Sequence, residues 1–280
     1  MTHWIAPMKT TSRQTGFGCG RVIRSARALL VALPLAAWAA DDSEPISPDR
    51  AGASISATTV GRGVTQLETG LQYTHESIGG SPAQRRFSVQ LAVRGGLTDK
   101  LELGVDGEPL VSLGGASDAT NIGALTLNAK YLFFDAPSDS AWPTLGLQPF
   151  VKLPVARQPI DSGKTNFGLL LLASFDLPAE LSMDVNAGVA GIGQSSGGYL
   201  AQAQAALGLA RDIAKTLQLF TDLSYASRDE HHGRSSLGLD AGVLWWPTPN
   251  VAVDASVVTS LVGQGPDWGL RAGVSVRFGH

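Results

Sequence analysis

Charged side chains recur at alternate positions in short segments along this chain of 280 residues, as in Leu101-Glu102-Leu103. Successive side chains on a strand point to opposite faces, so the charges of such a segment share one face. Charges that line a pore decide which solutes enter it. The candidates for this chemistry are Glu68, Arg94, Glu102, Asp106, Lys130, Lys152, Asp176, Asp184, Asp222, Asp240, Asp254, Arg271 and Arg277.

The same charges could instead pair across neighbouring strands and fill a narrow interior. Arg94 and Glu102 flank one short turn, and the sequence predicts an ion pair of that kind between them.

Several apolar side chains fall on the same face as the charges. They are Leu132, Leu170, Leu172 and Phe220, together with Phe150, Leu200 and Leu244. One interpretation is an apolar track for a hydrophobic solute. The other is interior packing, or a local shift of register at a β-bulge.

Other chemistry has weaker support in the sequence. His231 and His232 are adjacent and lack the spacing of a closed metal site, so we expect a solvated loop, no metal and no cofactor. His75 could join Ser77 at a catalytic rim, but the chain contains neither G-x-S-x-G nor H-E-x-x-H. We therefore do not expect an enzyme.

The elements that must position these residues are strands. From Thr65 to Phe278 the chain alternates apolar and polar residues in about a dozen segments, joined by connections that alternate between short and long. Outward aromatic residues are expected in two belts, one near the long loops and one near the short turns. The pattern predicts an all-β fold, a transmembrane antiparallel up-and-down β-barrel of about 12 strands over residues 64–280.

The start of the chain has a different composition. Residues 1–39 combine a basic region, an apolar run and Ala37-Trp38-Ala39, which is typical of an export signal with its cleavage site. The single cysteine, Cys19, lies in that region. Residues 40–63 show no period, and we expect a flexible periplasmic lead-in, with a plug inside the lumen as an open alternative.

The charge of the chain bears on its partners. The formal net charge is −3, and removal of residues 1–39 takes away five basic residues and no acidic one. This acidic balance argues against nucleic acid as a partner.

Five stretches of the chain resemble the outer-membrane proteins of the "MetA-pathway of phenol degradation" family. They are ISPDRAGASISATTVGRGVTQLETGLQY (46–73), LAVRGGLTDKLELGV (91–105), IGALTLNAKYLF (122–133), FVKLPVA (150–156) and WPTPNVAVDASV (246–257). The chain departs from the expected pattern at Ala51 and at Val155-Ala156. The resemblance implies an outer-membrane channel linked to uptake of aromatic or other hydrophobic compounds.

Together these features predict a passive channel for small solutes in the outer membrane of a Gram-negative cell. Its expected partners are outer-membrane lipid, a small-molecule solute and the barrel-assembly machinery. The alternative is a surface protein that transports nothing and acts through its loops, in an adhesive or structural role.

Overall fold

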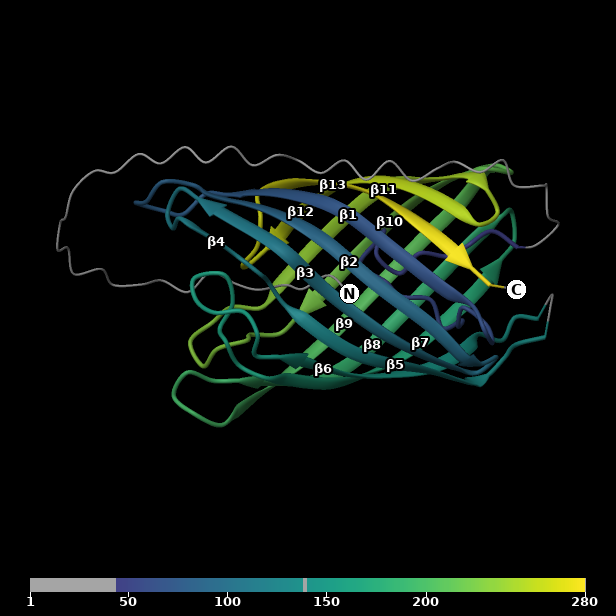
Figure 1. The fold of residues 1–280 in the computed structure, drawn as a ribbon, viewed down its shortest axis with the longest axis horizontal. Helices are drawn as coiled ribbons and strands as arrows, with labels where there is room; N and C mark the ends of the chain where they lie inside the picture. Colours follow the sequence, from purple (N-terminus) through teal and green to yellow (C-terminus); the bar gives the residue numbers. More distant parts are fainter. Residues whose placement is uncertain (1–43, 138–139, 280) are drawn as a thin grey trace.

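The computed structural model describes residues 44–137 and 140–279. The described chain forms thirteen strands and is drawn as a ribbon in Figure 1. The strands are β1 (Thr65–Glu76), β2 (Gln84–Thr98), β3 (Leu101–Gly114), β4 (Ala119–Asn121), β5 (Leu125–Phe134), β6 (Thr144–Leu153), β7 (Asn166–Leu177), β8 (Leu181–Gly193), β9 (Tyr199–Ala214), β10 (Leu217–Ala226), β11 (Ser236–Thr248), β12 (Val251–Val262) and β13 (Trp268–Phe278).

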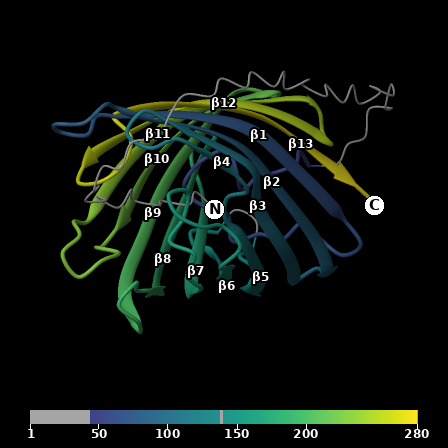
Figure 2. The ribbon, with the colours of Figure 1, turned by 60° about the vertical axis from the view of Figure 1, so that its left-hand side comes forward.

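Twelve of these strands close into a barrel. Each pairs antiparallel with its neighbours, and β1 pairs both with β2 and with β13, from Thr65 opposite Phe278 to His75 opposite Trp268. The short β4 pairs only with the end of β3. The predicted all-β antiparallel barrel of about 12 strands is therefore confirmed, and its curved wall is visible in Figure 2. Among the described residues, no helix has the length and apolar character needed to cross a membrane.

The two ends of the barrel differ in their connections. One end, here called the short-turn end, carries residues 99–100, 178–180, 215–216 and 249–250, together with 135–143. The other, the long-loop end, carries 77–83, 115–124, 154–165, 194–198, 227–235 and 263–267. β3 continues past a register shift to Gly114, so the connection that follows it begins at Gly115.

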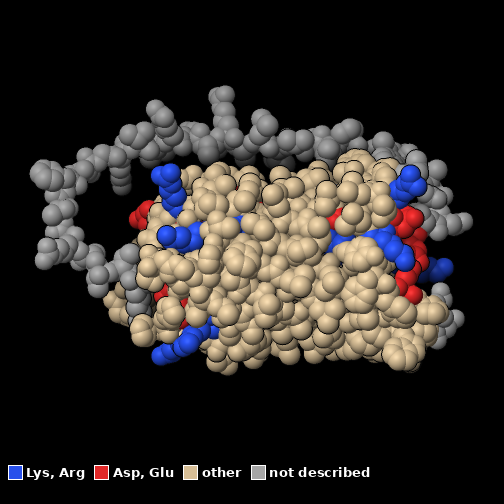
Figure 3. All heavy atoms as spheres, turned by 90° about the horizontal axis from the view of Figure 1, so that it is seen from below, with Lys and Arg blue, Asp and Glu red and all other residues tan. Residues whose placement is uncertain are grey.

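The outer surface of the barrel is apolar between its ends. Exposed side chains there include Leu71, Val93 and Val257. On the face seen in Figure 3, most charged side chains gather at the two ends and leave a band between them. Such a band matches the apolar zone of a barrel that sits in lipid.

Aromatic side chains border this band on both sides. Near the long loops, Tyr73 packs against Trp268 and Phe167 packs against Tyr199, with ring centroids 5.6 and 5.0 Å apart. Near the short turns, the exposed aromatic residues include Tyr131, Phe133, Trp245 and Phe278. The exposure and position of these rings agree with the two predicted belts.

Most residues of the segment 44–63 lie inside the barrel, and we call this segment the plug (Figure 1, purple). Ile46, Ile55 and Ala57 are buried. The prediction of a flexible periplasmic lead-in is wrong for these residues, because their backbone and side chains bond to inward-facing residues of the wall. The plug alternative is the one that the structure adopts.

The alternation of faces can be tested at two adjacent residues of β1. Leu71 is 52% exposed on the outer face, whereas Gln72 lines an inner cavity. In lipid, Leu71→Arg should lower the free energy of unfolding by about 2–4 kcal/mol, because the charge meets hydrocarbon. Gln72→Arg should cost much less. Urea unfolding of the refolded variants in vesicles measures both, and equal losses would contradict an outward-facing Leu71.

Candidate functional site

Arg94 on β2 is the centre of a charge network at the short-turn side of the lumen. Its Nε donates to Glu102 at 2.7 Å, and its Nη2 donates to the same carboxylate at 3.0 Å. Its Nη1 donates to Glu68 at 3.1 Å and to the carbonyl of Ser47 in the plug at 3.0 Å. The predicted Arg94–Glu102 pair is confirmed, and it also holds the plug.

The two carboxylates of this network also accept hydrogen bonds from plug backbone. Glu68 accepts from the amide of Arg50 at 2.9 Å, and Glu102 accepts from the amide of Val60 at 2.8 Å. Lone backbone donors inside a protein need partners. Wall carboxylates thus accept the hydrogen bonds that carbonyl groups of a neighbouring strand would accept in a sheet.

Asp49 brings an acidic group of the plug to two wall cations. Its carboxylate lies 2.7 Å from Lys130 Nζ and 3.3 Å from Arg94 Nη2. Burial raises the pKa of Asp49, but the charges of Arg94 and Lys130 outweigh burial, so the net shift of its pKa is downward. Asp49 is therefore ionised when it binds them.

Arg50 provides the converse contact, a plug cation on a wall acid. Its guanidinium is paired with Asp254 of β12. Gly70 and Gly273, which face each other on β1 and β13, leave the space that this guanidinium occupies. A Cβ at Gly70 would lie 2.6 Å from Arg50 Nη1. The glycines thus form a cradle for one side chain of the plug.

The middle of the plug is bound by β7, β8 and β10. Asp222 accepts from the amide and the hydroxyl of Ser54. Asn186 accepts from the amide of Ile55 at 2.7 Å and donates to its carbonyl at 2.8 Å.

Asp184 interacts with the plug indirectly, through the hydroxyl of Ser174. It accepts from Ser174 Oγ, and that oxygen also accepts from the amide of Ala57 at 2.9 Å. Asp184 therefore orients a hydroxyl that holds the plug.

The predicted apolar track does not line an open passage. Leu170 and Leu172 face inward, but they pack against Ile55 and Ala57 of the plug, with Phe150 beside them. Leu244 packs in the same way with Ile46 of the plug. The interior-packing interpretation therefore describes Leu172 and Leu244, whereas Phe150 and Leu170 also line a small cavity beside the plug.

The remaining members of the track occupy different places. Leu132 is buried and Phe220 is half-buried, with its ring against Gly242 of the next strand. Leu200 is half-buried near the loop 227–235. The seven residues do not form one continuous apolar surface.

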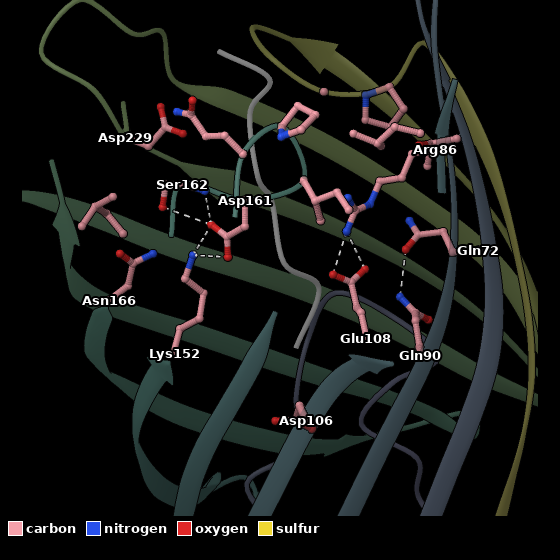
Figure 4. Close-up of a pocket in the computed structure, with 18 of the residues that line it drawn as sticks. Gln72, Arg86, Gln90, Asp106, Glu108, Lys152, Asp161, Ser162, Asn166 and Asp229 are labelled. Atoms are coloured by element: carbon pink, nitrogen blue, oxygen red, sulfur yellow. Dashed lines mark hydrogen bonds and ion pairs between the residues drawn. The ribbon is translucent and has the colours of Figure 1, made fainter. Parts of the chain in front are cut away.

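A cavity of about 520 Å³ occupies the lumen at the long-loop end (Figure 4). On one side Arg86 of β2 donates to both oxygens of Glu108 of β3, at 2.7 and 2.8 Å. Across the cavity, Lys152 Nζ of β6 lies 2.7 Å from both oxygens of Asp161. Two closed ion pairs therefore line the cavity, together with further charged and apolar side chains.

The other predicted charges lie around this cavity or at the barrel ends. Arg271 lines the cavity and donates to Asp240 at 2.8 Å, and both are buried. Asp106 also lines it and accepts from Asn128. Asp176 is exposed, and Arg277 donates to Asn250 and to the carbonyl of Glu44. These last two do not belong to the cavity.

Sequence reasoning missed several charged residues of the lumen, among them Asp49, Arg50, Arg86, Glu108 and Asp161. Asp49 and Arg50 lie in the plug, Arg86 lies near the start of β2, Glu108 lies at the register shift in β3, and Asp161 lies in the loop 154–165. An acid and a base side by side in an aperiodic segment, Asp49-Arg50, was the one available indication that this segment meets charged partners.

The described histidines lie at the long-loop end of the barrel. His231 and His232 line the mouth of the cavity together with Asp229, the pKa of which is raised by burial. In residues 44–137 and 140–279, no three His, Cys, Asp or Glu side chains are grouped to hold a metal ion. His75 stacks on Trp268 and lies 3.6 Å from Asp267, within an aromatic belt.

These features define a class of protein: a closed, outer-membrane-type β-barrel whose lumen is filled by its own N-terminal segment at one end and hollow at the other. The chain belongs to the family described as "Putative MetA-pathway of phenol degradation", whose model matches residues 48–278. None of the curated proteins matches the sequence.

Several solved structures share the fold. An outer membrane channel from Pseudomonas putida F1 is 14% identical, with a TM-score of 0.62 over 83% of this chain and 100% of that chain. The NanC porin is 11% identical, with a TM-score of 0.52 over 76% and 98%. The KdgM porin, solved in complex with disordered oligogalacturonate, is 10% identical, with a TM-score of 0.50 over 75% and 99%. At these identities the likeness is one of fold.

The anchoring of the plug can be tested by removing one wall acid. Asp254→Asn leaves the Arg50 guanidinium buried without its partner, a loss of about 3–5 kcal/mol that favours release of the plug. Ile55 is 3% exposed, so a cysteine in its place is shielded while the plug is bound. The rate at which a maleimide labels this cysteine therefore measures release of the plug. We expect labelling of Ile55→Cys to be faster by at least an order of magnitude in the Asp254→Asn background.

The matched control is Asp240→Asn, which removes the acid from a pair whose cation, Arg271, belongs to the wall. Labelling should stay close to that of the Ile55→Cys parent. Equal acceleration by both substitutions would indicate general loosening of the barrel and contradict a specific anchor.

Proposed function

We propose that this chain is an outer-membrane channel that admits small solutes at its long-loop end and is closed at its short-turn end by the plug. The observation that carries the proposal is the cavity of about 520 Å³, lined in part by ion pairs, inside a closed barrel. Loop residues including His232 and Pro266 form part of its lining, so it lies at the mouth of the barrel. The channel folds of the similar structures support the proposal.

The proposed mechanism is passive diffusion without covalent chemistry. A solute enters between the outer loops and meets the paired charges of the cavity. Beyond them, plug residues close the lumen by contact with β7, β8 and β10. Passage to the other end therefore requires the plug to move.

For the solute we propose small aromatic or other hydrophobic compounds, a choice supported by the description of the family. The short-turn end would face the periplasm and the long loops the exterior of a Gram-negative cell, as is usual for such barrels. Lipid surrounds the apolar band, and the barrel-assembly machinery inserts the chain in this proposal. The export signal proposed for residues 1–39 lies outside the described residues.

A disulfide between plug and wall tests whether plug movement opens the channel. A Cβ at Gly208 of β9 would lie 3.0 Å from Ser54 Cβ, a few tenths of an ångström short of the usual disulfide range. In planar bilayers, the refolded Ser54→Cys, Gly208→Cys variant should conduct less when oxidised, and reductant should restore its conductance. Cys19, the only native cysteine, lies within the proposed export signal.

The single variant Ser54→Cys is the control, and its conductance should not change when reductant is added. A folded barrel that carries no current in any state would favour the surface-protein alternative. Block of the current by phenols or aromatic acids would support the aromatic assignment, and block by neither would count against it.

A further inference from the structure

A second, smaller cavity adjoins the first beside the plug. Its volume is about 150 Å³, and it lies between plug residues Ala53 and Ile55 and the wall from β5 to β10. Four residues line both cavities: Lys152, Asn166, Ile192 and Gln202. The boundary between the two spaces is therefore set by these side chains.

Lys152 is the only cation among the four, and it is held in place at this boundary. Its ammonium group is buried and bonded to both oxygens of Asp161, which also accepts from the amide and the hydroxyl of Ser162. Figure 4 shows the pair projecting into the larger cavity beside Asn166. A charged solute that passes this point must compete with a closed, buried ion pair.

The loop that carries Asp161 is fixed to a neighbouring part of the wall, two strands away from β6. Ala156 and Ile160 are buried in one apolar cluster with Val111 of β3, and Leu113 and Ala119 pack against that cluster. The loop 154–165 is thus folded into the lumen, and its acid has a defined position. This makes the pair a fixed constriction rather than a chance contact of a surface loop.

The smaller cavity has an apolar side and a polar side. Phe150, Leu170 and Ile55 contribute the apolar surface, and Gln204 and Ser224 contribute polar groups. The Ser224 hydroxyl is buried and has no hydrogen-bond partner among the described residues. A cavity of about this volume with Leu, Ile and Phe in its lining holds one benzene ring. A single ring with one hydrogen-bonding substituent therefore fits both sides.

We propose that the Lys152–Asp161 pair is the selectivity point of the channel, which passes neutral single-ring solutes into the smaller cavity and rejects charged ones. The proposal rests on the channel function proposed above. Towards the short-turn end the cavity is closed by the contact of Ile55 and Ala57 with Leu170 and Leu172. The bound solute is released when the plug moves.

The selectivity point can be tested by removing either charge of the pair and measuring the reversal potential of the current in a KCl gradient. The two removals should shift this potential in opposite directions. Asp161→Asn leaves the ammonium unpaired and should raise the chloride-to-potassium permeability ratio several-fold. Lys152→Met leaves the carboxylate unpaired and should shift the ratio several-fold in the other direction. The double variant, which has neither charge and no unpaired ion to destabilise its fold, should return close to the wild-type ratio.

Block of the current by two solutes tests the selection of cargo. Phenol should block the wild-type channel and benzoate should not, whereas benzoate should block Asp161→Asn and the double variant. Ser224→Ala should weaken block by phenol about two- to tenfold, the range expected for one lost hydrogen bond. Asp176→Asn is the matched control, because Asp176 is exposed and lines neither cavity, and it should leave both patterns nearly unchanged.

The outcomes separate this proposal from the channel function. Current with wild-type reversal potentials in both single variants, or an equal shift in Asp176→Asn, would overturn the selectivity point and leave the channel intact. Block of the wild type by benzoate as strong as block by phenol would overturn the preference for neutral solutes. A folded wild type without any current would overturn the channel itself.

Discussion

Closure of the sheet between β1 and β13 is the constraint on which the rest of this structure depends. Hydrocarbon offers no hydrogen bonds to a polypeptide backbone, so a strand that faces lipid needs partners on both edges. Pairing from Thr65–Phe278 to His75–Trp268 removes the last free edges of the barrel. Once the sheet is closed, every side chain on one face points outward and every side chain on the other enters a narrow interior.

The contents of that interior explain the plug. Buried charges are costly unless they are paired and hydrogen-bonded. The wall supplies some of its own pairs, such as Arg94 with Glu102 and Arg271 with Asp240. Lys130 and Asp254 take theirs from the plug, in Asp49 and Arg50. The plug is thus an electrostatic complement of the wall as well as a space-filling segment.

The two halves of the lumen differ for the same physical reason. At the short-turn end, backbone amides of an irregular segment bond to Glu68, Glu102 and Asn186, so the space is filled. At the long-loop end, Arg86 pairs with Glu108 and Lys152 pairs with Asp161, so these four charges need no partner from the plug, and a cavity is left. The hollow mouth above the plug is where the proposed selection of solutes would take place.

The sequence by itself determined the features that depend on neighbouring residues. Alternation along Thr65–Phe278 decided the faces of the strands, the aromatic belts and the inward position of Glu68 or Asp240, because the period of a strand is a local property. It also predicted the Arg94–Glu102 pair, whose members are eight residues apart across one turn.

Only the tertiary structure decided where residues 44–63 lie and which charges they meet. Arg50 and Asp254 are 204 residues apart, and they meet only when the barrel closes. The plug has no period to detect, since its amides bond to side chains from several strands rather than to one neighbouring strand. The register shift in β3 that brings Glu108 inward likewise depends on its pairing with β2, which no local pattern encodes.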